Sequence, residues 1–190
     1  MMRLVPLWLC LAGVLASEAG PLTLVVDYES PPAAASMAAM QKELDRLLQA
    51  SPLRIDWKLR DDLRAGESVN DLAVVRFRGS CRMETMPIVF DERGPLAFTH
   101  TADGEILPFT EVFCDNVRTA ARSAMWAGEV ARGDELLGRA MARVVAHEVF
   151  HMLTKSHDHS KDGVFKKRLS GAQLIAERFD FAAADLKRLR

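Results

Sequence analysis

The stretch DELLGRAMARVVAHEVFHML, residues 134–153, predicts a helix of about twenty residues. Gly133 separates it from the preceding segment, and Asp134 is a favourable N-cap residue. Near its end, His147 and His151 are four positions apart, so both side chains lie on one face of the helix. This helix therefore carries two possible metal ligands, and the other predicted elements are described relative to it.

Three strands and one helix are predicted in residues 21–79. Residues 21–28 are rich in Leu and Val, 53–59 alternate apolar and polar residues, and 72–79 form another apolar run. A helix is expected over 30–50, beginning at Ser30 or the prolines after it, because its apolar residues recur at helical spacing. A short strand is also expected at 87–90.

A hairpin is predicted in the middle of the chain. Residues 96–101 and 105–113 flank the turn sequence ADG. Pro108 lies inside the second arm, so this arm should be an edge strand or should bulge there. Helices are expected over 116–131, capped by Asp115, and over 170–190. Strands early and long helices late indicate an α+β fold.

Residues 1–19 have the layout of a secretory signal peptide. A short positive start precedes an apolar run from Leu4 to Leu15, and cleavage is expected after Ala19 or Ala16. The run is shorter than the roughly 20 apolar residues that span a membrane, so no span should remain after its removal, with an uncleaved anchor as the alternative. Residues 20–190 should then form a single domain in the periplasm or outside the cell.

Charge and cysteine content narrow the possible functions. The chain has 25 basic and 26 acidic side chains, and no block of basic residues stands out. Nucleic-acid binding and membrane-surface binding therefore have no electrostatic support. Removal of the signal peptide leaves Cys81 and Cys114, which should form a disulfide in an oxidising compartment, with two buried free thiols as the alternative.

Residues 147–151, HEVFH, fit the pattern H-E-x-x-H. Zinc accepts imidazole nitrogens at about 2.0–2.1 Å, and a catalytic zinc site keeps one position open for water. Glu148 could act as the general base toward that water, whose pKa the metal lowers. A solvated His/Glu helix face and a purely structural metal site are the alternative interpretations.

Two histidines are too few for tight zinc binding, so a third ligand is expected. The metzincin pattern H-E-x-x-H-x-x-G-x-x-H would make it His157, but Thr154 occupies the glycine position and no methionine follows Met152. His157 and His159 are both possible, because a loop of five or seven residues can bring either side chain back to the helix. Glu177 is a more remote candidate.

The chain resembles the zincin metallopeptidases, and among them a group of short exported bacterial proteins with the H-E-x-x-H motif. The resemblance runs through VVRFRGSC and THTADGEILPFTEVFCD to Ser170, and it covers roughly residues 72–175. It implies a small mixed sheet with an edge strand over the cleft, a long active-site helix and packed helices. It also implies that His159 is the preferred third ligand, with His157 as the alternative, and it supports a zinc-dependent peptidase-like fold more than a particular reaction.

The predicted function is therefore that of an exported zinc metallopeptidase acting on a peptide or protein substrate. His100, in the hairpin, could stabilise an oxyanion, although an ordinary strand histidine is the simpler interpretation. Asp158 could orient a ligand imidazole. The rival functions are a non-catalytic zincin-fold binding module, sequestration of zinc, copper or nickel, and a zinc ion that only stabilises the fold.

Overall fold

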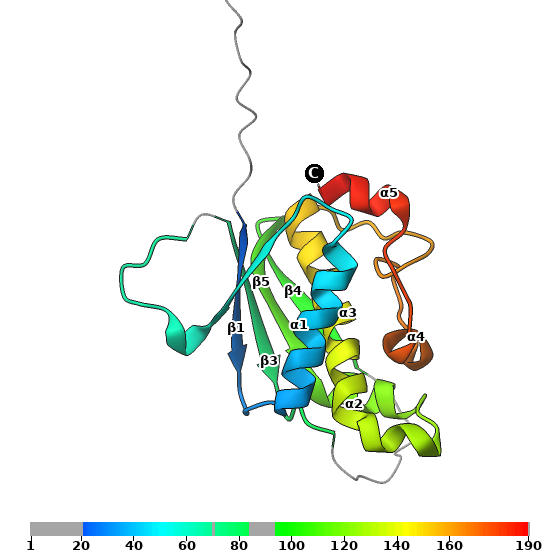
Figure 1. Cartoon of the computed structure of the whole chain (residues 1–190). Coiled ribbons are helices and arrows are strands. Elements are labelled where there is room, and N and C mark those ends of the chain that lie inside the picture. The colour runs from blue at the N-terminus through cyan, green and yellow to red at the C-terminus, as the bar shows by residue number, and fades with distance from the viewer. Residues whose placement is uncertain (1–20, 70, 84–93, 190) are drawn as a thin grey trace, which may run out of the picture.

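The computed structural model describes residues 21–69, 71–83 and 94–189. The expected signal peptide, 1–19, and the strand expected at 87–90 lie outside the described residues. The fold is of the α+β class, with one mixed sheet and helices packed against it (Figure 1). Within the described ranges, no helix combines the length and apolarity needed to cross a membrane.

The sheet has five strands in the order β2-β1-β3-β5-β4. Four of them run parallel, and β4 runs antiparallel to β5 at one edge. The strands are β1 (Leu22–Tyr28), β2 (Ile55–Leu59), β3 (Leu72–Arg78), β4 (Ala97–Ala102) and β5 (Glu105–Phe113). All five agree with the strands predicted from apolar patterning.

Pro108 lies in an inner strand, and the strand compensates by bulging. The register of β4 against β5 shifts between the pairs Thr99–Thr110 and Thr101–Ile106, leaving three residues of β5 opposite one of β4. Pro108 is one of those three. A bulge tolerates proline because the ladder is already interrupted there. The predicted bulge is thus confirmed, whereas the edge strand is β4.

Two long helices, α1 and α3, lie side by side over one face of the sheet (Figure 1). They approach closely at Gly138, where an added Cβ would lie 2.2 Å from the Ser36 carbonyl oxygen. The helices are α1 (Ala34–Leu48), α2 (Cys114–Arg122), α3 (Gly133–Thr154), α4 (Gly171–Ile175) and α5 (Ala183–Leu186). Short 3₁₀ turns occupy Arg60–Asp62, Ala127–Arg132 and Lys187–Leu189. The central helix α3 has 22 residues, which confirms the predicted helix of about twenty residues and extends it by one residue at each end.

The ends of two predicted helices differ from expectation. Asp115 lies in the first turn of α2 rather than at its N-cap. The α-helix ends at Arg122, residues 123–126 are not helical, and a separate 3₁₀ turn begins at Ala127. Asp134 also lies inside its helix. Its Oδ1 accepts hydrogen bonds from the Met83 backbone N–H at 2.7 Å and from the Ser36 hydroxyl at 3.3 Å. The Asp134 carboxylate therefore binds other segments of the chain instead of capping the first turn of α3.

The single helix predicted over 170–190 is wrong. The segment forms α4 and α5, separated by extended backbone whose polar groups bond elsewhere. The Val164 N–H donates to the Asp180 carbonyl at 3.0 Å, and Arg139 donates to the Ile175 carbonyl at 3.0 Å. These long-range partners outcompete the helical hydrogen bonds that helix propensity alone predicts.

A buried arginine joins both long helices to this C-terminal segment. Arg143 of α3 is fully buried and pairs with Glu43 of α1 at 2.7 Å. It also donates to the carbonyl oxygens of Gln173 at 2.5 Å and Ala176 at 2.8 Å. Burial of a guanidinium is tolerated when its donors are satisfied in this way. The C-terminal segment is thereby fixed against α3.

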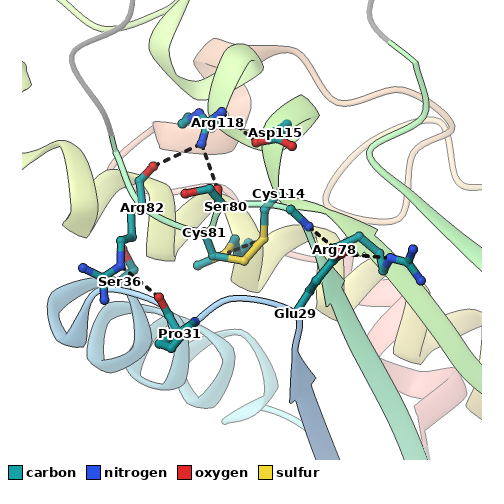
Figure 2. Close-up of a disulfide and its surroundings, with 12 residues drawn as sticks. Glu29, Pro31, Ser36, Arg78, Ser80, Cys81, Arg82, Cys114, Asp115 and Arg118 are labelled. Carbon is teal, nitrogen blue, oxygen red and sulfur yellow. Dashed lines mark hydrogen bonds and ion pairs between the residues drawn. A yellow bond between two sulfur atoms is a disulfide. The ribbon is translucent and has the colours of Figure 1, made fainter.

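Cys81, just after β3, and Cys114, at the start of α2, form the expected disulfide (Figure 2). Both cysteines are fully buried, and their Cα atoms are 5.0 Å apart. Figure 2 shows Arg118 beside the bridge, donating to the Ser80 carbonyl at 2.9 Å. A structural disulfide of this kind points to an oxidising compartment, in agreement with export.

Candidate metal centre

Three of the four clustered histidines come together at the end of α3. The Nε2 atoms of His147 and His151 are 3.2 Å apart. With His159, they offer three ligand atoms that all lie within 4.8 Å of one another. His147 and His151 are buried, whereas His159 is exposed. The grouping contains His159 rather than His157, which is exposed and lines the neighbouring cleft.

The turn that follows α3 explains which histidine returns to the helix. Thr154 is still helical, and Lys155 takes the left-handed conformation with φ of 49°. The left-handed residue thus comes one position after the metzincin glycine. Lys155 Nζ donates to the Ile106 carbonyl at 2.8 Å, which ties the turn to β5. The chain then comes back toward α3 at His159.

Backbone carbonyls define the tautomers of the two helical histidines. His147 Nδ1 lies 3.0 Å from the Val164 carbonyl oxygen, and His151 Nδ1 lies 2.6 Å from that of Ser156. A carbonyl can only accept, so each Nδ1 carries the proton and each neutral ring keeps a lone pair on Nε2. Metal-binding histidines are typically oriented in this way. These carbonyls perform the role predicted for Asp158, and nothing local in the sequence identifies them.

The two facing lone pairs fit a metal ion. Neutral imidazoles of this tautomer cannot hydrogen-bond to each other through Nε2. Burial lowers the pKa of His147 to about 4 and also lowers that of His151, which disfavours an imidazolium there. In a tetrahedral zinc site, ligand nitrogens are about 3.3 Å apart, close to the 3.2 Å between these atoms. The donor set suits zinc, and also copper or nickel.

Phe165 packs against the rings of the cluster. It is fully buried, and its ring centroid lies 5.2 Å from that of His147, 4.7 Å from His151 and 5.4 Å from His159. Phe150 is also buried, and its ring centroid lies 4.0 Å from that of Phe165. The aromatic ring restricts how the imidazoles can rotate. Sequence analysis missed this residue because the contacts are not local.

The loop that carries His159 is held by the C-terminus. The Ser160 hydroxyl donates to Asp185 Oδ1 at 2.5 Å, and Asp185 is buried. The Arg188 guanidinium lies 5.1 Å above the Phe150 ring and 5.9 Å from the Phe165 ring. The third histidine thus depends on residues at the far end of the chain for its position.

Glu148 lies beside the cluster and faces the edge strand. The Thr99 hydroxyl of β4 donates to Glu148 Oε2 at 2.6 Å. Burial raises the pKa of the Glu148 carboxyl. A carboxyl with a raised pKa can accept a proton and hold it, as a general base requires. Thr99 was not predicted as a site residue.

A cleft with a volume of about 830 Å³ opens over the three histidines and Glu148. The edge strand β4 forms one wall, α3 contributes His147, Glu148 and His151, and residues 166–170 form another wall. The predicted arrangement of an edge strand over a cleft is therefore present. The side chains that line this space come from segments far apart in the sequence.

Two weaker candidates lie elsewhere. His100 Nε2 is 3.3 Å from Glu111 Oε2, and the His100 ring packs 4.8 Å from the Phe109 ring. The residues on either side of it, Thr99 and Thr101, line the cleft, so His100 occupies the alternate position of the strand. Glu177 is exposed beyond α4 and is not part of the histidine cluster.

No known family model and no curated protein matches this chain. Its function must be inferred from the geometry and chemistry of the site.

Proposed function

We propose that this protein is an exported zinc-dependent peptidase with a zincin-like site. His147, His151 and His159 would hold the metal, and Glu148 would be the general base. One observation carries the proposal: the Nε2 atoms of His147 and His151 lie 3.2 Å apart, and the half-buried Glu148 carboxylate lines the same cleft. That combination matches the ligands and the base of a hydrolytic zinc site.

A bound zinc ion would polarise the scissile carbonyl and lower the pKa of a water molecule. The protein's contribution is to position the acid–base group. Thr99 engages one oxygen of Glu148, which leaves the other oxygen available to take a proton from the attacking water. The raised pKa of Glu148 favours retaining that proton until it is delivered to the leaving amine.

The edge strand supports a peptide as the substrate. In the described part of the sheet, β4 pairs only with β5, so its other edge can offer backbone N–H and C=O groups. An extended peptide can add to such an edge as a further strand, which brings its backbone across the cleft. The cleft is also lined by apolar residues of this region, including Leu96 and Ile106.

Elemental analysis of purified residues 20–190 tests the metal site. The parent should contain one zinc per chain. Glu148→Ala and His157→Ala should retain it, and His159→Ala should lose it. A parent without stoichiometric zinc would contradict the proposal. Loss of zinc from His157→Ala but not from His159→Ala would show that His157 is the third ligand, as in the metzincin spacing.

Cleavage of a peptide library tests the reaction. The zinc-loaded parent should cleave, and Glu148→Ala should not, although both hold the metal. Zinc binding without cleavage by the parent would indicate the alternative function of a metal-binding or non-catalytic zincin-fold module. If chelation unfolds the protein and no peptide is cleaved, the metal only stabilises the fold.

A further inference from the structure

Three consecutive cations line the wall of the cleft opposite α3 and β4. Lys166 is partly buried, and Lys167 and Arg168 are exposed. Among the described residues that line the cleft, only Glu148 carries a carboxylate. The chain as a whole has a formal net charge of −1. The positive character is therefore a local property of this wall.

The backbone on both sides of these cations is anchored. Phe165 precedes them and is fully buried against the histidine rings. Ser170 follows as the N-cap of α4, where its hydroxyl accepts a hydrogen bond from the Gln173 N–H at 3.2 Å. The intervening segment is thus held at both ends beside the histidine cluster, so its charges remain at the cleft.

None of the three cations forms an ion pair with any other described residue. Elsewhere in the molecule, basic side chains are commonly paired: Arg143 with Glu43, Arg76 with Asp27, and Arg118 with Asp115. Unpaired cations gathered on one wall of a cleft raise the local concentration of anionic ligands. A divalent metal ion at the histidines would add to this potential.

We propose that the cleft selects peptide segments with acidic side chains close to the bond being cleaved. This inference rests on the proposed function and specifies its substrate class. The edge of β4 recognises any extended backbone, whereas the cations at 166–168 distinguish side chains by charge. Basic peptides would be disfavoured by the same field. The proposal requires no contact between the cations and the scissile bond itself.

Binding can be measured without cleavage by using zinc-loaded Glu148→Gln. Fluorescence anisotropy would compare labelled short peptides that carry Glu and Asp with matched peptides that carry Gln and Asn. The acidic peptide should bind about tenfold more tightly at low salt. The preference should weaken as salt is raised, because the Debye length falls from about 10 Å at 0.1 M to about 3 Å at 1 M. Equal affinities would overturn the proposal.

Reversing the charges of the cleft wall tests whether these cations cause the preference for acidic peptides. In the same background, Lys167→Glu/Arg168→Glu should abolish or invert the preference. The control Lys42→Glu/Arg178→Glu, which reverses two exposed charges away from the cleft, should leave it unchanged. Thermal unfolding and zinc content should match across the variants. An unchanged preference in the cleft variant would also overturn the proposal.

Two further comparisons separate the possible failures. If an oligonucleotide or an anionic vesicle binds more tightly than the acidic peptide, the proposal that the cleft binds acidic peptides is wrong. If the acidic preference holds but the parent cleaves nothing, the proposed hydrolysis fails while the ligand class stands. If the parent cleaves peptides without regard to acidic residues, the inference fails and the proposed function survives.

Discussion

At the scale of single residues, the Thr99 hydroxyl holds the carboxylate of Glu148, the proposed general base. It lies 49 positions before Glu148 and contacts it only because β4 passes beside α3. Its 2.6 Å hydrogen bond holds one carboxylate oxygen and restricts the rotation of the side chain. Accurate placement of a general base matters because small displacements of a catalytic group are costly.

Thr99→Val should lower kcat roughly tenfold or more and change KM little, since a hydrogen bond to a charged group contributes about 1.5–3 kcal/mol. Valine preserves the volume of the threonine side chain but cannot donate the hydrogen bond that orients Glu148. Steady-state kinetics on a cleaved library peptide would measure it, with zinc content checked in parallel. Thr101→Val, at another cleft-lining threonine, is the matched control. An equal effect of both changes would argue against a specific role for Thr99.

At the scale of elements, α3 depends on what packs against it. The pair of Arg143 and Glu43 connects α3 to α1, and the same guanidinium binds carbonyls of the segment around α4. Sequence patterning correctly predicted α3 itself, because a helix of this length follows from local periodicity. It predicted one C-terminal helix where there are two, since the competing partners of that backbone lie on α3 and near Val164.

Arg143→Ala should destabilise the protein by about 2–4 kcal/mol, because it leaves the carbonyls of Gln173 and Ala176 without their donor and leaves Glu43 with Arg46 as its remaining partner. Urea unfolding followed by circular dichroism would measure this change. The control Arg132→Ala removes an exposed pair with Glu135 and should cost less than about 1 kcal/mol. A loss of similar size in both variants would show that Arg143 does not join the elements as described.

At the scale of the whole molecule, the disulfide closes a 33-residue separation between β3 and α2. It joins the sheet to a helix that packs on α3, and so it supports the layer that carries the site. The bridge is remote from the histidine cluster in chain order. Its expected role is stability, with no part in the reaction.

Replacing Cys81 and Cys114 together by serine should lower the free energy of unfolding by about 3–4 kcal/mol, from the entropy of the opened loop. Chemical denaturation of the variant against the oxidised parent would measure it, and reduced parent provides a second comparison. Zinc content should be unchanged under native conditions. A variant as stable as the oxidised parent would contradict the structural role.

The sequence alone determined the fold class, the five strands, a helix over about residues 134–153 and the pair of histidines four positions apart. These features follow from periodicity, which acts over a few residues. Only the tertiary structure decided between His159 and His157, placed Thr99 against Glu148 and brought Lys166 to Arg168 to the cleft wall. Each of these depends on where distant backbone crosses α3. Such contacts arise from packing between elements, which the local pattern does not encode.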